Sequence, residues 1–327
     1  MLKPYKTAKR EDYYEKTVQM LIVLASAAAL IAISGCSAIG SAPTLPSETI
    51  PDTISASSEA AKAASEETTG SNGGSRLNDI LARGYIEVAM EPYFAPNEFI
   101  DPSRQGEEQY VGADVELARY IADKLGVECR IVPLEFSAVL TGVTEGKYDL
   151  AISALAYTPA RAEAMEMSKG YRFDEDNANN FGLMIRSGDL DTIKSADDLT
   201  DKIVVCQSGS LQELFATEQI PACRELKRVS ATTDGFLMVQ EGKADAVVTE
   251  KKTAELFIAA NAESSMVIVP DFSFVVDEST SGTRIGIPKG ETALLNKINE
   301  IIDEVTASGI YDEWYEKYTE YAKTLGL

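Results

Sequence analysis

The sequence predicts an α/β protein with two similar lobes, and two observations indicate this class. Strand-like and helix-like segments alternate from about Arg76, and a second alternating series begins near Phe181. Such alternation is typical of mainly parallel sheets covered by helices. Residues 145–150 (EGKYDL) also recur as residues 241–246 (EGKADA), each copy ending a helix at Gly and starting a strand at Asp. A chain of 327 residues, 45% of them hydrophobic, can give each lobe a core.

The first series is predicted from local patterns. Residues 115–125 place apolar side chains on one side of a helix, and Gly126 ends it. We predict helices at 77–83, 115–125 and 136–144, and strands at 85–90, 128–134 and 150–153. Residues 91–99 lie between them as an aromatic, proline-containing loop with two carboxylates.

The second series repeats the arrangement. We predict strands at 181–185, 203–206, 226–229 and 245–249, and helices from Leu211, at 232–241 and at 251–260. The chain then continues through residues 284–290 into helices that reach about Thr319. An apolar stripe on these helices is predicted to belong to the core: Ile298, Ile301, Ile302 and Val305.

One helix start carries a functional signal. Thr158 is a good N-cap, and Pro159 falls at the first helical position, where its missing N–H costs nothing. Arg161 then lies in the first turn, where the helix dipole disfavours a positive charge. An anion bound beside Arg161 would explain this placement, and pairing with a surface carboxylate is the alternative.

The internal repeat suggests what that anion belongs to. Each repeat leads into a strand with a polar end, at Ser153 in the first copy and at Glu250 in the second. Arg161 and Glu250 would therefore present opposite charges from two lobes, as a bound zwitterion requires.

Composition excludes several functions. The chain carries 52 Asp+Glu against 30 Lys+Arg, a formal net charge of -22, which argues against nucleic acid as a partner. It contains no histidine, so catalysis by Ser-His-Asp or Cys-His groups and the common zinc sites are excluded. We expect no metal, no cofactor and no catalytic residue.

The first 75 residues indicate export. A lysine-rich start precedes an apolar run at residues 20–33, which is typical of a signal peptide and short for a membrane-spanning helix. Residues 33–36 (ISGC) resemble a lipoprotein cleavage site, so we predict a signal peptide at 1–35 and a lipid on Cys36. An ordinary secreted protein, or an uncleaved anchor, is the alternative. Residues 36–75 are rich in Ser, Thr, Ala, Pro, Gly and Glu and are predicted to be a disordered tether.

Several motifs in order resemble a known family. They are GADVELA at 112–118, GKYD at 146–149, TPAR at 158–161, GKAD at 242–245, IGIPKG at 285–290 and SGIYDEWY at 308–315. Together they resemble the amino-acid-binding proteins of ABC importers, solute-binding family 3, over residues 77–322. The resemblance implies a two-lobed periplasmic-binding-protein-like (type II) fold with two crossover strands. It implies lobe 1 at 76–180 and 276–327 and lobe 2 at 181–275.

The resemblance also implies roles for individual residues. Arg161 would hold the α-carboxylate of an amino acid and Glu250 its α-ammonium, where the family more often has Asp. Ala156 matches a position that is often Ser or Thr, so only its backbone would remain to bind the carboxylate. The other matching positions would line the cleft: Glu91 near the ligand side chain, Phe94 and Phe136 as aromatic walls, and Ser153, Gln207 and Ser210. An acid at position 91 favours a cationic or amide-bearing ligand, and either phenylalanine taken alone is more readily explained as core.

The implied function is an extracytoplasmic, lipid-anchored, monomeric receptor that closes over a free amino acid and delivers it to a membrane permease. The alternatives are a cyclohexadienyl dehydratase-like enzyme on the same fold, with Glu91 and Glu250 as its acid–base pair, or a ligand-sensing domain. Residues 169–176 (KGYRFDED) depart from the family pattern. A disulfide between Cys206 and Cys223 remains open, although the helix between them favours their separation.

Overall fold

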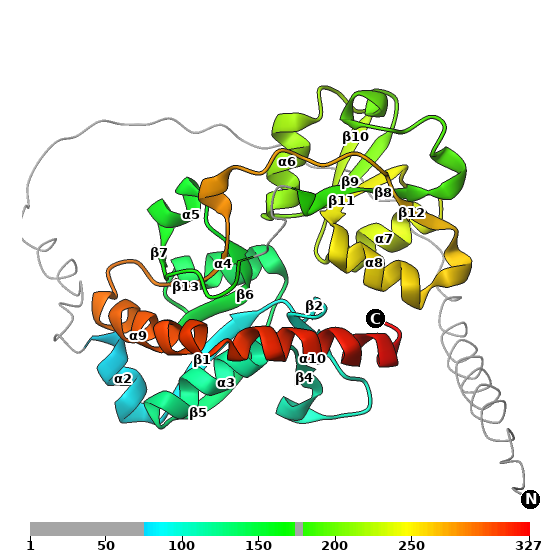
Figure 1. Cartoon of the computed structure of the whole chain (residues 1–327). Coiled ribbons are helices and arrows are strands. Elements are labelled where there is room, and N and C mark those ends of the chain that lie inside the picture. Colours follow the sequence, from blue (N-terminus) through cyan, green and yellow to red (C-terminus); the bar gives the residue numbers. More distant parts are fainter. Residues whose placement is uncertain (1–74, 174–178) are drawn as a thin grey trace, which may run out of the picture. The chain divides into compact units, whose positions relative to one another are not determined.

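The computed structural model describes residues 75–173 and 179–327, which contain two five-stranded sheets (Figure 1). We call the first sheet with its helices lobe 1 and the second lobe 2. The predicted signal peptide, Cys36 and all but the last residue of the predicted tether lie outside the described residues. The mixed α/β class with two lobes is confirmed.

The lobe 1 sheet has the strand order β5-β1-β6-β13-β7. Its strands are β1 (Tyr85–Met90), β5 (Glu128–Pro133), β6 (Leu150–Ala156), β7 (Glu166–Met167) and β13 (Thr283–Ile287). The first three are parallel, with Val88 paired to both Ile131 and Leu150, whereas β13 runs antiparallel to β6. The predicted strand at 150–153 is three residues longer in the structure.

Helices cover both faces of this sheet. Successive side chains of each strand point to opposite faces, and apolar side chains on both faces pack against helices. Val88 packs with α3 and α9 on one face, and Ala89 packs with α4 on the other. The lobe 1 helices are α2 (Arg76–Arg83), α3 (Ala113–Leu125), α4 (Phe136–Thr144), α5 (Pro159–Ala164), α9 (Thr292–Ser308) and α10 (Ile310–Leu325). The predicted stripe on α9 is buried as expected. The last helix continues past the predicted end at Thr319 because Gly326 caps it.

Lobe 2 repeats this plan with the strand order β10-β9-β11-β8-β12. Its strands are β8 (Phe181–Arg186), β9 (Ile203–Gln207), β10 (Glu225–Val229), β11 (Ala246–Glu250) and β12 (Met266–Ile268). Val204 packs against α6 (Leu211–Gln219) on one face. Val205 packs against α7 (Thr232–Gln240) on the other face, where α8 (Lys251–Ala260) also lies.

The loop predicted at 91–99 contains two short strands instead. β2 (Tyr93–Phe94) pairs with β3 (Glu98–Ile100), which pairs with β4 (Tyr110–Val111). Gly112, which follows β4, lies close to the backbone of Asn97. Only glycine fits there, because a Cβ would lie 2.1 Å from the carbonyl oxygen of Asn97. The sequence did not predict this hairpin because its strands are too short to show an alternating pattern.

The chain crosses between the lobes twice, and the described ends of the crossings lie together in lobe 1. The N–H of Thr283 donates to the carbonyl of Arg172, and the N–H of Tyr171 donates to the carbonyl of Thr283, both across 2.9 Å. Part of the atypical acidic segment, residues 174–176, lies outside the described residues. In its described part, Lys169 forms an ion pair with Asp303 of α9.

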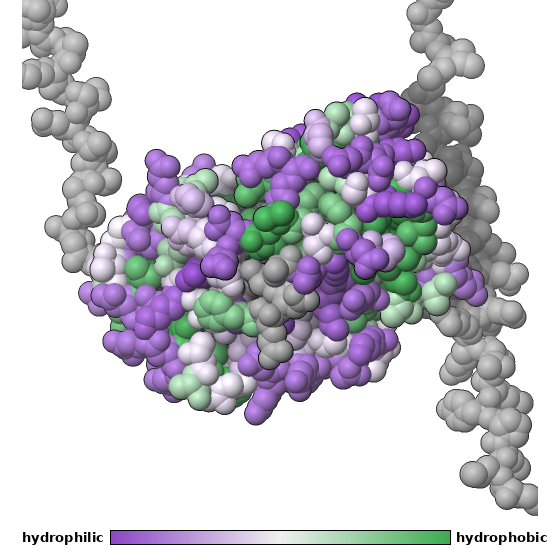
Figure 2. All heavy atoms as spheres, turned by 45° about the horizontal axis from the view of Figure 1, so that its top comes forward, coloured by the Kyte–Doolittle hydropathy of each residue, from purple (hydrophilic) through white to green (hydrophobic). Residues whose placement is uncertain are grey.

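Three cysteines in the described ranges, Cys129, Cys206 and Cys223, are free thiols, so Cys206 and Cys223 form no disulfide here. None of the helices in the described part of the chain is both long and apolar enough to cross a membrane. Hydrophilic residues cover most of the face seen in Figure 2, with apolar patches between them.

Candidate functional site

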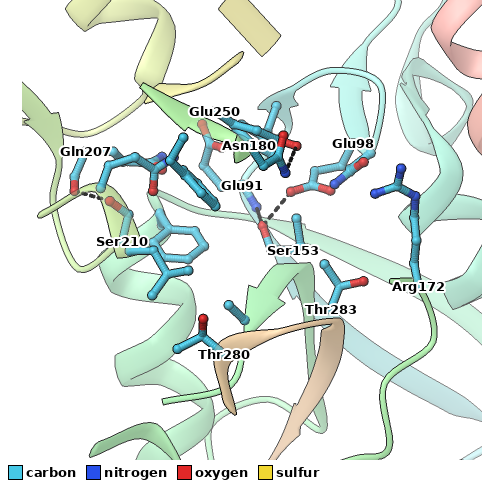
Figure 3. A pocket seen from close by; sticks show the side chains of 18 of the residues that line it. Glu91, Glu98, Ser153, Arg172, Asn180, Gln207, Ser210, Glu250, Thr280 and Thr283 are labelled. Atoms are coloured by element: carbon cyan, nitrogen blue, oxygen red, sulfur yellow. Dashed lines mark hydrogen bonds between the residues drawn. The ribbon is translucent and has the colours of Figure 1, made fainter. Parts of the chain in front are cut away.

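A pocket lies where both lobes contribute strand ends, and it collects all nine predicted binding residues (Figure 3). These are Glu91, Phe94, Phe136, Ser153, Ala156, Arg161, Gln207, Ser210 and Glu250. Glu91 directly follows β1, Gln207 ends β9 and Glu250 ends β11. The carboxyl ends of strands are where open α/β sheets bind ligands. The empty volume is about 740 Å³, part of it open to solvent.

Arg161 is held in this pocket by backbone carbonyls. Thr158 accepts a hydrogen bond from the N–H of Arg161 and Pro159 occupies the first turn of α5, which confirms the predicted helix start. The guanidinium of Arg161 donates to the carbonyl of Ala156 at 2.8 Å and to that of Gly209 in lobe 2 at 2.9 Å. It forms no ion pair with a described residue, and the pairing with a surface carboxylate is therefore not observed. Burial lowers the pKa of Arg161 to about 10, which leaves the group protonated at neutral pH.

Aromatic rings form the wall beside Arg161. The Arg161 guanidinium lies 5.5 Å from the ring centre of Phe136, within range of a cation–π contact. Phe136 also packs in the lobe 1 core with Val139, so the core and the wall interpretations both hold for it. Phe94 is half-buried on β2 and lines the same pocket. Ala156 contributes the carbonyl that accepts from Arg161 and has no hydroxyl to offer a ligand.

Lobe 2 contributes polar groups that are already fixed. The Ser210 hydroxyl donates to the carbonyl of Gln207 at 2.7 Å and accepts from the N–H of Glu213, capping α6. The amide of Gln207 donates to the carbonyl of Ser230 at 3.1 Å. Because these groups are held in place, they shape this side of the pocket without having to reorder.

Glu250 stands at the end of β11, on the lobe 2 side. Its carboxylate accepts from the side-chain amide of Asn180 at 3.1 Å (Figure 3). It also accepts from the hydroxyl of Thr253 at 3.3 Å. Asn180 also lines the pocket, next to the crossing from lobe 1. The pocket thus presents a fixed cation, Arg161, and a fixed anion, Glu250.

Ser153 links the backbone of one acidic residue, Glu91, to the side chain of another, Glu98. Its hydroxyl accepts from the N–H of Glu91 at 3.0 Å and donates to Glu98 at 2.7 Å. Glu91 is 2% exposed and Glu98 is 0% exposed. Burial raises the pKa of Glu91 to about 8, and burial together with the charge of Asp114 raises that of Glu98 well above its usual range.

Asp114 supports this cluster from behind. It accepts from the N–H of Ala154 at 2.7 Å and from the hydroxyls of Tyr171 and Tyr311. Burial raises its pKa as well. Ala154 has φ of +47°, a left-handed conformation that a residue with a side chain rarely adopts. Asp114 therefore fixes a strained turn of β6 to the crossing segment that contains Tyr171.

Several pocket residues were not predicted. Glu98, Asn97, Arg172, Asn180, Gln212, Thr280 and Thr283 also line the pocket. The two carboxylates of the 91–99 loop were visible in the sequence, but only the β2–β3 hairpin turns Glu98 towards Ser153. Among the described residues, no group of three or more His, Cys, Asp and Glu could hold a metal ion.

Comparisons with known proteins agree with this geometry. The chain is 27% identical over 259 residues to a probable histidine-binding protein of Campylobacter jejuni, covering 76% of this chain and 90% of that protein. An L-arginine-bound amino acid ABC transporter substrate-binding protein, AbpA of Streptococcus pneumoniae, is 28% identical with a TM-score of 0.66. That match covers 75% of this chain and 98% of the other.

A third match bears on the enzyme alternative. It is an ancestral amino acid-binding protein described as a precursor of cyclohexadienyl dehydratase, 28% identical with a TM-score of 0.63. It covers 74% of this chain and 99% of the other chain.

The family model of the bacterial extracellular solute-binding proteins, family 3, matches residues 86–321. The chain therefore belongs to the bacterial extracellular solute-binding proteins of family 3.

Proposed function

We propose that this protein is an extracytoplasmic receptor that binds a free amino acid and delivers it to an ABC importer. The observation that carries the proposal is Arg161, a buried guanidinium that forms no ion pair with a described residue. A buried charge is costly unless an opposite charge is near it, and the two carbonyls that accept from Arg161 compensate its charge only in part. A ligand carboxylate beside Arg161 would supply that opposite charge, in a two-pronged geometry that suits guanidinium.

The remaining groups suit the rest of an amino acid. Glu250 would accept the α-ammonium from the lobe 2 side, while Phe94 and Phe136 would enclose the aliphatic part. Glu91 would face the ligand side chain, which favours a cationic or amide-bearing amino acid. We assign residues 76–180 and 276–327 to lobe 1 and 181–275 to lobe 2. Ligand contacts from both would favour a closed arrangement over an open one.

Membrane attachment is a separate part of the proposal. The apolar run at 20–33 and the ISGC motif at 33–36 support a signal peptide and a lipid on Cys36. The composition of residues 36–75 supports a flexible tether between that lipid and the lobes. Such a monomer would meet its permease on the outer face of the membrane. Metabolic labelling with a palmitate analogue tests this, because labelling should be lost in Cys36→Ala.

The enzyme alternative has weaker support. A dehydratase would need an acid–base pair in the pocket, and Glu91 and Glu250 are the candidates. The family and the relatives described above are binding proteins, including the precursor of the dehydratase. Incubation with prephenate is the check, since measurable product formation would reject a purely binding role.

Thermal unfolding with each of the twenty amino acids tests the receptor function. A ligand that binds the folded state raises its stability by about 2.7 kcal/mol at a hundredfold excess over the dissociation constant. We expect one or a few amino acids to raise the midpoint. A repeat after unfolding and refolding removes any amino acid retained through purification, and no response in either experiment would reject the proposal.

A further inference from the structure

Two acidic residues that line the pocket, Glu91 and Glu98, are buried and have no cation partner among the described residues. Glu91 and Glu98 approach the same hydroxyl, that of Ser153, one through its N–H and the other through its carboxylate. Both side chains line the pocket (Figure 3), and neither forms an ion pair with a described residue. Uncompensated carboxylates at this depth are unfavourable.

Each carboxyl group also has one oxygen that accepts no hydrogen bond. Oε1 of Glu91 and Oε2 of Glu98 are buried and have no hydrogen-bond partner among the described residues. A carboxylate has no donor of its own, so two such buried oxygens lining one pocket require a proton or an external donor. A positively charged ligand group would bring several donors at once.

The charges around the two carboxyl groups disfavour their ionised forms further. The charge of Asp114 on α3 contributes to raising the pKa of Glu98, and that of Asp234 on α7 of lobe 2 contributes to raising the pKa of Glu91. The cations of the pocket are engaged elsewhere: Arg161 donates to two carbonyls, and the Arg172 guanidinium lies 3.7 Å from the ring centre of Tyr315. Lobe 2 adds the neutral amide of Gln207 and the negative charge of Glu250 to the same pocket.

The pKa values agree with this geometry. Burial raises the pKa of Glu91 to about 8, partly offset by the side chain of Gln207. Burial and the charge of Asp114 raise the pKa of Glu98 well above its usual range. Without a cation in the pocket, Glu91 therefore favours its protonated form at neutral pH, and the pKa of Glu98 is shifted in the same direction.

We propose that Glu91 and Glu98 act as one pair that exchanges a proton for the positively charged side chain of an amino acid. The inference rests on the proposed receptor function and adds that binding of a cationic amino acid is coupled to the release of a proton. A cation enters the pair and one proton leaves to the solvent, so the net charge of the pocket is unchanged. Affinity for a cationic amino acid then rises with pH, by up to about tenfold per pH unit for one released proton. A neutral amino acid releases no proton.

The test is calorimetric titration of the full chain with L-arginine, with L-glutamine as the uncharged comparison. Titrations at about pH 6.5 in two buffers with different ionisation enthalpies give the number of protons released. The chain has no histidine, so few other groups titrate near this pH. We expect a release approaching one proton with L-arginine and close to none with L-glutamine.

Variants locate the source of the proton. Glu91→Gln and Glu98→Gln each remove one acidic member of the pair, and we expect either to reduce the release by half or more. Using both keeps the test valid if one of them does not fold. Glu135→Gln changes an exposed carboxylate at the N-terminus of α4 and is expected to leave the release unchanged.

The outcomes separate the two proposals. Binding of L-arginine without proton release, or of L-glutamine alone, overturns the proton exchange and leaves the receptor function standing. The same release in wild type and in both pair variants also overturns it. Failure of every amino acid to bind overturns the receptor function, and the exchange falls with it.

Discussion

The guanidinium of Arg161 in lobe 1 donates a hydrogen bond to the carbonyl of Gly209 in lobe 2, across 2.9 Å. This contact places the cation of the pocket at the boundary between the lobes. A ligand carboxylate that binds Arg161 would therefore lie where both lobes can reach it. Ligand binding and the relative arrangement of the lobes are then linked through one side chain.

Replacing Arg161 should weaken ligand binding strongly while the protein still folds. Arg161→Met removes the charge and keeps an apolar chain, so the ligand carboxylate loses its partner. We expect affinity to fall by roughly 2–5 kcal/mol, about 30-fold to several thousand-fold. Arg130→Met is the control, because Arg130 is an exposed residue of β5 paired with Glu128. Equal affinities for wild type and Arg161→Met, measured by calorimetry, would reject the role of Arg161.

Glu250 should contribute through its charge rather than its shape. Glu250→Gln keeps one acceptor oxygen for Asn180, and its amide N–H can donate to the hydroxyl of Thr253, but it loses the negative charge that would meet the α-ammonium. We expect a loss of about 1.5–3 kcal/mol in binding, roughly 10- to 150-fold. Glu255→Gln on α8, the helix that follows Glu250, is the control, since the Glu255 side chain is 60% exposed. A similar effect from both variants would assign the loss to general electrostatics.

Replacing Ala154 with glycine should stabilise the protein. Its φ of +47° costs an alanine roughly 1–2 kcal/mol, whereas glycine adopts it freely. Allowing for the greater chain entropy of glycine, Ala154→Gly should stabilise the protein by about 1 kcal/mol and raise the melting midpoint by roughly 2 °C. Ala151→Gly on the same strand should do the opposite, because Ala151 is 0% exposed and would leave a cavity. Thermal unfolding of both variants checks the sign, and a loss of stability in Ala154→Gly would refute the strain.

The buried carboxyl groups predict how the stability of the ligand-free protein depends on pH. The pKa of Glu91 is about 8 in the folded state against about 4.3 in an unfolded chain. Between these values the folded state binds more protons, so the free energy of unfolding falls as pH rises, by about 1.4 kcal/mol per pH unit for one such group. Glu98 and Asp114, whose pKa values are also raised, act in the same direction.

Denaturant unfolding between about pH 5 and pH 8 measures this slope without interference from histidine, which the chain lacks. We expect Glu91→Gln to reduce the slope by up to one such contribution. Parallel slopes in wild type and variant would show that Glu91 is ionised in the folded protein over this range.

The sequence predicted those features that depend on local patterns. The start of α5 at Pro159 follows from its N-cap, and the strand ends that bring Arg161 and Glu250 into one pocket follow from the alternation and the internal repeat. Glu98 was missed for a physical reason. Its position depends on the β2–β3 hairpin, whose strands are too short to give a periodic pattern, and on Ser153, which lies 55 residues away and leaves no local signal. The same holds for Asn180, whose approach to Glu250 spans 70 residues.

The central claim is that an amino acid is held by its α-carboxylate on Arg161. The most direct measurement is the calorimetric affinity for the amino acid with the largest thermal shift and for its α-methyl ester, which lacks that negative charge. We predict that wild type binds the ester at least about a hundredfold more weakly, a difference of about 2.7 kcal/mol. We also predict that this preference disappears in Arg161→Met. Equal affinities of wild type for the acid and the ester would contradict the account.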